Sequence, residues 1–369
     1  MYPHELRLAS LRIALETAGL GGAVLSQPQH VFYFTGFLPG PAPHYLVIAP
    51  QRAAAVGPVP IPGWETILYS SYDIHHGWDI PNHSAAALEE AINAVGLTGK
   101  ALGAELPHLT AHAFTTLSAQ RNTLHDLSHL LWSLRRIKDP AEIAQIKANV
   151  AANDHMFGLV QQAIQPGVSE YDLWGRIYTE MCRANGGPIT LEADLGVGPR
   201  GANPDAKPGP YLVERGDAVF VDVYSCQHGY YADTTRVFFT AEPTPKQREV
   251  YGILLEALVA GEEALRPGVR ACDVDAAVRG VIAKAGYGEN FYHHSGHAYG
   301  VFQQEKPYLI PAETTTLEAG MILTLEPGIY LPGWGGMRLE SNYLISQGGP
   351  ERLDNYPNSI AIPGIAKNL

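Results

Sequence analysis

The sequence predicts an α/β or α+β fold with two domains. Its 369 residues are enough for about two domains of roughly 100 to 200 residues each. The 38 glycines and 28 prolines indicate many turns, and helix-like and strand-like stretches alternate along the chain. Hydrophobic residues make up 46% of the chain and charged residues 17%, which favours packed cores over disorder.

Charge and the termini exclude several classes of function. The net charge of −12 argues against nucleic-acid binding. Apolar runs such as residues 322–325 are far shorter than the roughly 20 residues of a membrane helix. The N-terminus has neither the basic start nor the apolar core of a secretory signal, and the three cysteines, Cys182, Cys226 and Cys272, are widely spaced. We therefore expect a cytoplasmic protein with free thiols and no membrane or nucleic-acid partner.

Residues 1–132 have the pattern of a small α/β domain. Leu8, Leu11, Ile13 and Leu15 give the first stretch an amphipathic character, which predicts a helix. Three apolar runs with the length of strands follow, at 23–25, 31–34 and 45–48.

A long helix is expected to open the second domain, residues 133–369. Asp139, Pro140 and Glu142 stand at the positions of an N-cap, a first-turn proline and the third residue of a capping box. Apolar residues at 143, 146 and 150 then continue with helical spacing.

The second domain contains an internal repeat. Residues 164–168 and 265–269 share a pattern ending in Pro-Gly-Val, 101 positions apart, and Asp172 and Asp273 follow at the same distance. Each copy lies between two helix-like stretches and precedes a glycine-rich and then a β-rich segment. The pattern predicts two related halves packed face to face, although helix-terminating Pro-Gly pairs also recur by chance.

Two carboxylates are expected to meet across a β-hairpin in the first half. Residues 218–223 and 231–239 alternate as strands, and 225–229 is turn-like. If the hairpin is symmetric about Gln227 and His228, Asp222 lies opposite Asp233. Like charges in that position destabilise a sheet, so the pair requires a cation.

The second half repeats this arrangement with glutamates. A strand at 321–325 ends in Glu326, a Gly/Pro-rich turn spans 327–336, and a strand at 337–345 carries Glu340 back to face Glu326. Four carboxylates carry a charge of about −4, which two divalent ions would cancel. His297, in the segment 293–300, is the best candidate for an imidazole ligand. The sequence thus predicts a dinuclear metal site.

The order and spacing of these residues resemble a known family. The spacings are 11 from Asp222 to Asp233, 29 from His297 to Glu326 and 14 from Glu326 to Glu340. Together with the motifs at 229–236, 296–297, 325–330 and 338–340, they resemble the pita-bread metallopeptidases: prolidase, aminopeptidase P, methionine aminopeptidase and the metal-free creatinase.

The resemblance implies a fold for each domain. Residues 133–369 would form a pita-bread catalytic domain, with a pseudo-twofold, curved, largely antiparallel sheet backed by helices. Residues 1–132 would form a smaller creatinase-type α/β domain. The segment 29–36 resembles the accessory domain of the prolidase and aminopeptidase P branch.

The resemblance also implies a reaction. Asp222, Asp233, His297, Glu326 and Glu340 would hold two divalent ions, Mn²⁺, Co²⁺ or Zn²⁺, and a bridging hydroxide would attack the peptide bond before proline in a dipeptide or short peptide. Glu326 would relay the proton, His293 would contact the carbonyl or substrate, and Tyr330 would help polarise the carbonyl. Arg338 shares a strand face with Glu340 and would orient it. A homodimer is expected.

Two positions depart from the family pattern. Gln304 stands where the family usually has a histidine, and Asp205 aligns with a second family histidine. Glutamine does not titrate near neutrality, and aspartate brings negative charge to a place where a product carboxylate would lie. Three alternatives therefore stay open: a same-fold peptidase with altered specificity, including a carboxypeptidase; a metal-free hydrolase; and a non-catalytic binding scaffold. Retention of all five ligands argues against the last two. Dipeptidase and aminopeptidase activity are not distinguished.

Overall fold

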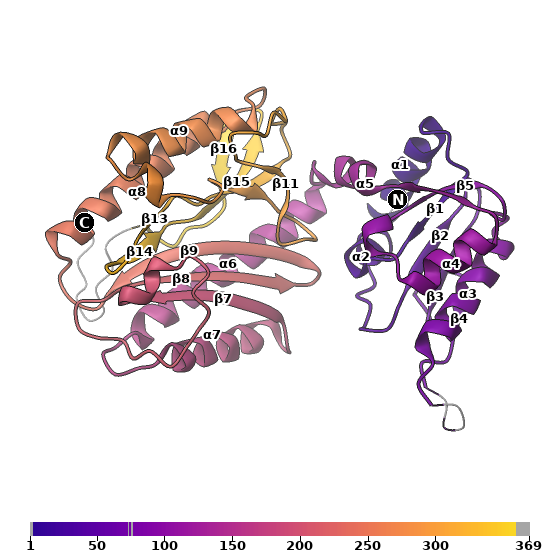
Figure 1. Ribbon diagram of the computed structural model, residues 1–369, viewed down its shortest axis with the longest axis horizontal. Helices are drawn as coiled ribbons and strands as arrows, with labels where there is room; N and C mark the ends of the chain where they lie inside the picture. The colour runs from indigo at the N-terminus through magenta and orange to yellow at the C-terminus, as the bar shows by residue number, and fades with distance from the viewer. Residues whose placement is uncertain (1–2, 73, 75–76, 359–369) are drawn as a thin grey trace. The chain divides into compact units, whose positions relative to one another are not determined.

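The structure is a computed structural model, which describes residues 3–72, 74 and 77–358 (Figure 1). Its contacts divide the chain into two compact units, Met1–Arg135 and Arg136–Leu369. The sequence placed the domain boundary after residue 132. Each unit is described below by itself.

The N-terminal unit is built on a mixed six-stranded sheet in the order β4-β3-β2-β1-β5-β6. The strand β2 pairs antiparallel with β1 and with β3, whereas the pairs β3–β4, β1–β5 and β5–β6 are parallel. The bounds are β1 Gly22–Leu25, β2 Tyr45–Ile48, β3 Ala53–Gly57, β4 Thr66–Leu68, β5 Ala101–Ala104 and β6 Thr123–Asp126.

Helices surround this sheet, and one of them replaces a predicted strand. They are α1 Pro3–Thr17, α2 Pro28–Thr35, α3 Ile80–Ala94, α4 Ala111–Ala119 and α5 Ser128–Arg135, with the short η1 Leu106–His108. The strand predicted at 31–34 is wrong, because these residues lie in α2, which has Pro28 in its first turn and a left-handed cap at Gly36. The run is apolar because this helix is buried, and so short a run does not distinguish a strand from a buried helix.

Four helices form the outer layers of the C-terminal unit: α6 Pro140–Ala163, α7 Glu170–Asn185, α8 Pro245–Ala264 and α9 Ala271–Lys284. The predicted start of α6 is confirmed, because the Asp139 side chain accepts hydrogen bonds from the amides of Ala141 and Glu142 in a capping box. Two short helices, η2 Gly198–Ala202 and η3 Gly288–Asn290, lie in loops. Within the described ranges, no helix has both the length and the apolar character needed to cross a bilayer.

The strands of this unit form antiparallel sheets between the helix pairs (Figure 1). The first sheet holds β7 Thr190–Val197, β8 Ala218–Gln227 and β9 Tyr230–Phe239; a second has the order β11-β10-β12-β15-β16; and β13 pairs with β14. The other bounds are β10 His297–Ala298, β11 Glu305–Tyr308, β12 Ile322–Leu325, β13 Gly328–Leu331, β14 Gly335–Arg338, β15 Ser341–Ser346 and β16 Gly349–Arg352. The valines of β8 pack toward α6 and α7, while Phe220 packs toward α8, as the predicted alternation requires. The predicted mixed α/β class is confirmed.

The internal repeat has a structural counterpart at the two Pro-Gly turns. Gly167 and Gly268 both have φ of 90°. The amide of Gly167 donates to Val213 O, and that of Gly268 donates to Leu317 O. Each turn joins two helices in the same way, so the two halves begin with the same supersecondary unit.

The register predicted for the first hairpin is wrong by two residues, because the turn is centred one position later than predicted. The strand β8 continues to Gln227, which pairs with Tyr230, and the turn contains only His228 and Gly229. Both turn residues have positive φ, 49° and 80°, as a tight two-residue hairpin turn requires. Consequently Asp222 lies opposite Thr235, and Asp233 is its diagonal neighbour on the same face.

The second hairpin keeps the predicted register but not the predicted long turn. Residues 327–336 contain β13 and the start of β14, and the turn is limited to 332–334. Leu325 pairs with Ser341 and Gly328 with Arg338, so Glu326 and Glu340 occupy opposed positions between the two paired segments. Both strands are interrupted at this level, which places the two carboxylates at a break in the sheet.

Candidate functional site

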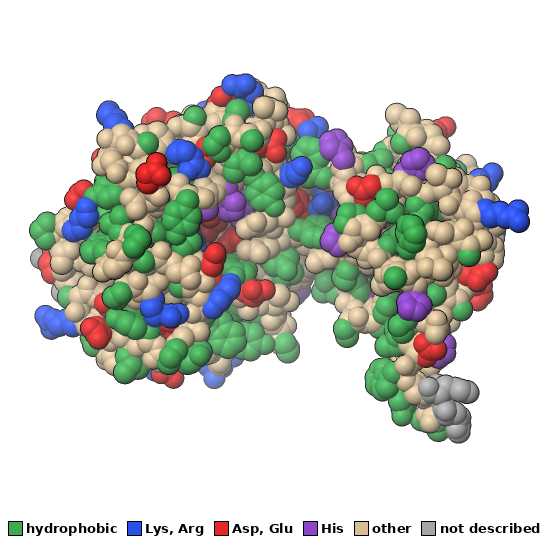
Figure 2. Space-filling view, viewed as in Figure 1, with side chains coloured by type: hydrophobic (Ala, Val, Ile, Leu, Met, Phe, Trp, Pro, Cys, Tyr) green, Lys and Arg blue, Asp and Glu red, His purple; other side chains and the backbone are tan. Residues whose placement is uncertain are grey.

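All five predicted ligands line one cavity of about 390 Å³ in the C-terminal unit. Asp222, Asp233, His297, Glu326 and Glu340 each come from a different strand or strand end, and none is more than 7% exposed. The space-filling view shows acidic and histidine side chains gathered in a hollow on this unit (Figure 2). Such burial of four carboxylates requires compensating charge.

A glycine brings His297 close to the neighbouring strand. Gly296 has φ of 156°, and a Cβ atom there would lie 2.0 Å from the carbonyl oxygen of Thr324. No larger side chain fits, so only glycine allows this segment to run against β12. As a result, ligand atoms of Asp233, His297 and Glu340 all lie within 4.8 Å of one another.

The imidazole of His297 presents a lone pair to carboxylates. Its Nδ1 lies 3.0 Å from Ala298 O, and because a carbonyl only accepts, Nδ1 carries the proton. Burial lowers the pKa of His297, so the ring is neutral and Nε2 is unprotonated. This Nε2 lies 3.5 Å from Glu326 Oε1 and 3.7 Å from Asp233 Oδ2. The imidazole nitrogen and the two carboxylates thus point their lone pairs toward one another, as ligands do around a bound cation.

Other atoms of the set also fit divalent ions. Within the described part of the chain, Asp222 Oδ1 and Asp233 Oδ1 are buried without a hydrogen-bond partner. Buried carboxylate oxygens are almost always paired or bound to a metal. The donor set of carboxylates and one imidazole suits Mn²⁺, Co²⁺ and Zn²⁺.

Repulsion between the buried carboxylates changes their pKa values. Burial, followed by repulsion from Asp222 and Glu326, raises the pKa of Asp233 well above its usual value. Burial and the charges of Asp233 and Asp222 raise the pKa of Glu340 in the same way. Burial also acts on Glu326, but attraction to His294 and the other histidines outweighs it and lowers the pKa of that carboxyl. Added positive charge would relieve the repulsion.

The role predicted for Arg338 is corrected by its contacts. Its Nη2 donates to Asp222 Oδ2 at 2.6 Å, so it orients Asp222 rather than Glu340. The strand is interrupted after Arg338, and the guanidinium reaches across to β8 instead of following the strand face. Glu340 is held by Thr235, whose Oγ1 donates to Glu340 Oε2 at 3.0 Å.

His293 and Tyr330 form a hydrogen-bonded chain with Arg338. Arg338 Nη1 donates to Tyr330 Oη at 3.0 Å, and His293 Nε2 lies 3.0 Å from the same oxygen. The other ring nitrogen of His293, Nδ1, lies 2.8 Å from His294 O and therefore carries the proton, so Nε2 accepts from the tyrosine. Burial lowers the pKa of His293 to about 4, which keeps the ring neutral near pH 7.

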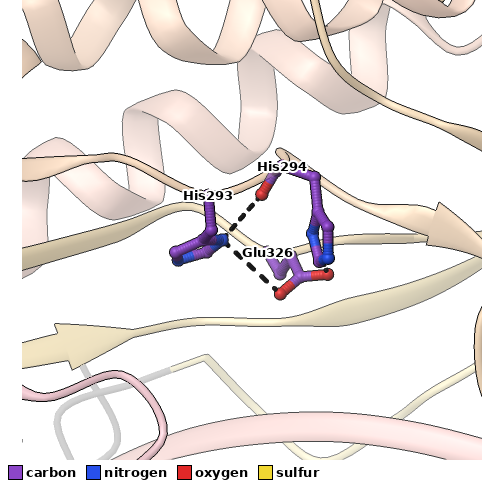
Figure 3. A group of neighbouring side chains, drawn as sticks. All are labelled: His293, His294 and Glu326. Atoms are coloured by element: carbon purple, nitrogen blue, oxygen red, sulfur yellow. Dashed lines mark hydrogen bonds and ion pairs between the residues drawn. The ribbon is translucent and has the colours of Figure 1, made fainter.

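His294 is part of the site although no role was predicted for it. Its Nδ1 lies 3.2 Å from Glu326 Oε1, and ligand atoms of His293, His294 and Glu326 lie within 4.8 Å of one another (Figure 3). Burial alone would lower the pKa of His294, but the negative charge of Glu326 outweighs burial and raises this pKa. Its position in a His-His pair shortly before His297 is the sequence signal that could have identified it.

The two positions that depart from the family pattern also line this cavity. Asp205 and Gln304 are both exposed at the cavity wall. The neighbouring Gln303 donates to Asp233 Oδ2 at 3.3 Å. Three further residues of the wall were not predicted: Asp194, Lys207 and Tyr224. They carry no motif: Asp194 and Tyr224 lie on the neighbouring strands β7 and β8, and Lys207 lies in the loop between η2 and β8.

Comparison with known proteins gives matches over both units. Residues 144–347 match metallopeptidase family M24, and residues 7–137 match the creatinase/prolidase N-terminal domain. The structure is similar to the Xaa-Pro dipeptidase from Bacillus anthracis, with 28% identity, a TM-score of 0.87 and coverage of 97% of this chain and 99% of that one.

Two further solved structures are similar over nearly their whole length. The prolidase from Thermococcus sibiricus has 28% identity, a TM-score of 0.87 and coverage of 98% of this chain and 99% of its own. The dipeptidase PepE from Mycobacterium ulcerans has 26% identity, a TM-score of 0.84 and coverage of 98% of both chains.

Proposed function

Because the chain belongs to metallopeptidase family M24 and has a creatinase/prolidase N-terminal domain, we propose that it hydrolyses the Xaa-Pro bond in dipeptides or short peptides. The observation that carries the proposal is the position of His297 Nε2, which lies 3.5 Å from Glu326 Oε1 and 3.7 Å from Asp233 Oδ2 in a cavity lined by buried carboxylates. The similarity to an Xaa-Pro dipeptidase and a prolidase supports the choice of bond.

Five residues would hold two divalent ions, Mn²⁺, Co²⁺ or Zn²⁺: Asp222, Asp233, His297, Glu326 and Glu340. When bound, the ions would supply Lewis acidity to the scissile carbonyl and lower the pKa of the attacking water. Glu326 would accept the proton of that water at its carboxylate and later deliver it to the leaving nitrogen. The histidines beside Glu326 favour its ionised form, which the first of these transfers requires.

The chain of His293, Tyr330 and Arg338 would act on the substrate carbonyl. Burial raises the pKa of Tyr330, so its hydroxyl keeps its proton near neutral pH. Arg338 fixes the hydroxyl oxygen, and His293 Nε2 accepts its hydrogen. A substrate carbonyl that took the place of His293 as acceptor would be polarised by Tyr330.

A second candidate is a peptidase of the same fold with altered specificity, including a carboxypeptidase. It is favoured by Asp205 and Gln304, which line the cavity where the family usually has histidines. The proposal also includes a homodimer in the cytoplasm. All three cysteines are free thiols, which agrees with a reducing compartment, and light scattering would measure the oligomer.

The test is a mass-spectrometric product assay on the full chain with added Mn²⁺, Co²⁺ or Zn²⁺. The substrates are Xaa-Pro dipeptides, tripeptides that begin with Xaa-Pro, and peptides without proline. We expect release of free Xaa, abolished by a chelator and lowered at least about 100-fold in Glu326→Gln, because that variant loses a ligand and a proton acceptor.

The matched control is Glu289→Gln, an exposed glutamate outside the cavity, which should retain full activity. Cleavage of dipeptides but not tripeptides would identify a dipeptidase. Cleavage only of peptides without proline would replace the main proposal with altered specificity. Absence of cleavage with every metal would leave the scaffold interpretation.

A further inference from the structure

We propose that Lys207 binds the free carboxylate at the C-terminal end of the peptide substrate. This inference rests on the proposed peptidase function, and it restricts the substrates to peptides whose C-terminus lies just beyond the scissile bond. The assignment depends on the charges of the cavity, on the position of the lysine and on its unused hydrogen-bonding capacity.

The cavity offers a substrate anion very few positive groups. Its described lining has six acidic side chains, Asp194, Asp205, Asp222, Asp233, Glu326 and Glu340; besides three histidines, it has one lysine, Lys207, and one arginine, Arg338. Arg338 is 4% exposed and already donates to Asp222, Thr235, Tyr330 and Pro204. The side chain of Lys207 is 57% exposed. His294 is already paired with Glu326, so of the lysine and the arginine in this lining, Lys207 is the cation that a ligand can reach.

Lys207 is held in place by two residues that neighbour the proposed metal ligands. Its Nζ forms an ion pair with Asp194 Oδ1 at 2.9 Å and donates a hydrogen bond to Tyr224 Oη. Asp194 lies directly opposite Asp222 in the sheet, and Tyr224 lies directly opposite Asp233. The lysine is thus anchored one cross-strand step from the two aspartates, where Cβ atoms lie about 4.5 to 5.5 Å apart.

The ammonium group keeps capacity for a ligand. It has three N–H donors, of which Tyr224 accepts one and Asp194 occupies one more direction. Glu192 lies at 4.0 Å and is exposed to solvent. Partial burial lowers the pKa of Lys207, but its partners Tyr224 and Asp194 outweigh that effect and raise it, so the lysine stays charged.

The position suits a C-terminal carboxylate in particular. In a dipeptide, the carboxylate lies one residue, about 3.8 Å, beyond the scissile peptide bond. A cation anchored beside the strands that carry the proposed metal ligands is close enough to contact this carboxylate. A charge-assisted hydrogen bond to a carboxylate is also stronger than a hydrogen bond between neutral groups. An acidic side chain of the substrate also carries a carboxylate, but at a different position. The test therefore distinguishes the C-terminal carboxylate from a side-chain carboxylate.

The experiment compares Lys207→Met with the wild type on four substrates. They are the dipeptide that the wild type cuts best, its C-terminal amide, an Ala-Asp amide and an Ala-Asn amide. We expect the wild type to prefer the free acid over its amide about tenfold in KM, and Lys207→Met to lose that preference with little change in kcat. The Asp and Asn amides should behave alike.

Three further variants separate recognition from structure. Lys207→Arg keeps the charge and should restore most of the preference, and Tyr224→Phe should weaken it, because the lysine loses one anchor. The matched control is Lys246→Met, since Lys246 is also held by a tyrosine, Tyr287, and by Glu249 but lies outside the cavity. It should leave the preference unchanged.

Calorimetric titration with the free dipeptide and its amide provides a readout that does not need turnover. If Lys207→Met no longer binds the free dipeptide more tightly than its amide, the inference is supported. This holds even if no peptide is cut, and in that case only the proposed function fails. An acid preference that persists in Lys207→Met overturns the inference while the peptidase proposal stands. A preference for the Asp over the Asn amide, lost in Lys207→Met, would instead assign the lysine to acidic side chains.

Discussion

The arrangement of the site depends on single hydrogen bonds that fix the direction of individual groups. The carbonyl of Ala298 fixes the tautomer of His297 and thereby turns a lone pair toward Asp233 and Glu326. Arg338 fixes one oxygen of Asp222, which leaves the other oxygen buried without a protein partner in the described residues. Both effects prepare donor atoms before any ion is bound.

The residue scale gives a prediction about metal binding and stability. Divalent metal added to metal-stripped protein should raise the melting temperature, because bound ions cancel the repulsion of the buried carboxylates. At a concentration 100 times the dissociation constant, the gain in the free energy of unfolding is about 2.7 kcal/mol. In Asp233→Asn, the metal-induced shift in a thermal melt should be largely lost.

The matched variant is Asp205→Asn, which removes an acidic group from the same cavity wall without touching the proposed ligand set. It should retain the shift. Equal shifts in both variants would show that Asp233 is not a ligand.

At the scale of elements, the β8–β9 hairpin sets the spacing of the two aspartates. The turn at His228 and Gly229 needs positive φ at both residues and limits the loop to two residues. A longer or shifted turn would change which residues face Asp222. Because side chains alternate between faces, a slip of one residue would also move Asp233 to the opposite face of the sheet.

We therefore predict that Gly229→Ala destabilises the protein by about 1 kcal/mol, because an alanine in the left-handed region is strained. Urea unfolding monitored by circular dichroism measures the change.

The contrasting substitution is Gly280→Ala in α9. That glycine is exposed, its added Cβ would meet no atom within 4 Å, and φ is not in the left-handed region, so the substitution should stabilise the protein by about 0.5 to 1 kcal/mol. A gain in stability for Gly229→Ala as well would contradict the conformation assigned to the turn.

At the scale of the whole molecule, a buried ion pair connects the two halves of the C-terminal unit. Arg236 of β9 donates to Asp354 Oδ2 at 2.6 Å, and both side chains are at most 2% exposed. Asp354 also accepts from Arg352 and from the amide of Asn342 in β15. Burial alone would raise the pKa of Asp354, but the positive charges of Arg236 and Arg352 outweigh burial and hold this pKa below its usual value.

This pair gives a prediction for acid stability. A lowered folded pKa means that the contribution of Asp354 is fully present above its unfolded pKa of about 3.9 and is lost as the pH falls through the folded value. Asp354→Asn should cost about 3 kcal/mol at pH 7, because it leaves Arg236 buried without its charged partner. The difference from the wild type, measured by urea unfolding, should shrink below pH 4.

The exposed pair of Glu351 with Lys147, at 2.6 Å, serves as the control. Glu351→Gln should change the free energy of unfolding by less than about 1 kcal/mol, since surface ion pairs contribute little. A difference between wild type and Asp354→Asn that stayed constant down to pH 2 would contradict the proposed linkage.

Features that depend on local order along the chain could be predicted from the sequence. The cap at Asp139, the two Pro-Gly turns and the opposed positions of Glu326 and Glu340 were all readable, because each rests on spacing along a short segment. The convergence of the five proposed ligands followed from the repeat. The helix α2 was misread as a strand because a short apolar run has no distinguishing period.

The partners of individual side chains could not be predicted, because they depend on the three-dimensional packing of distant segments. The true turn at His228 and Gly229 shifted the facing residue of Asp222, and the break after Arg338 sent its guanidinium to Asp222 rather than to Glu340. The cluster of Lys207, Asp194 and Tyr224 joins a loop residue to two residues of neighbouring strands. Contacts between distant segments depend on the strand register and on where strands are interrupted. The backbone conformation of a few turn residues determines the register and the interruptions.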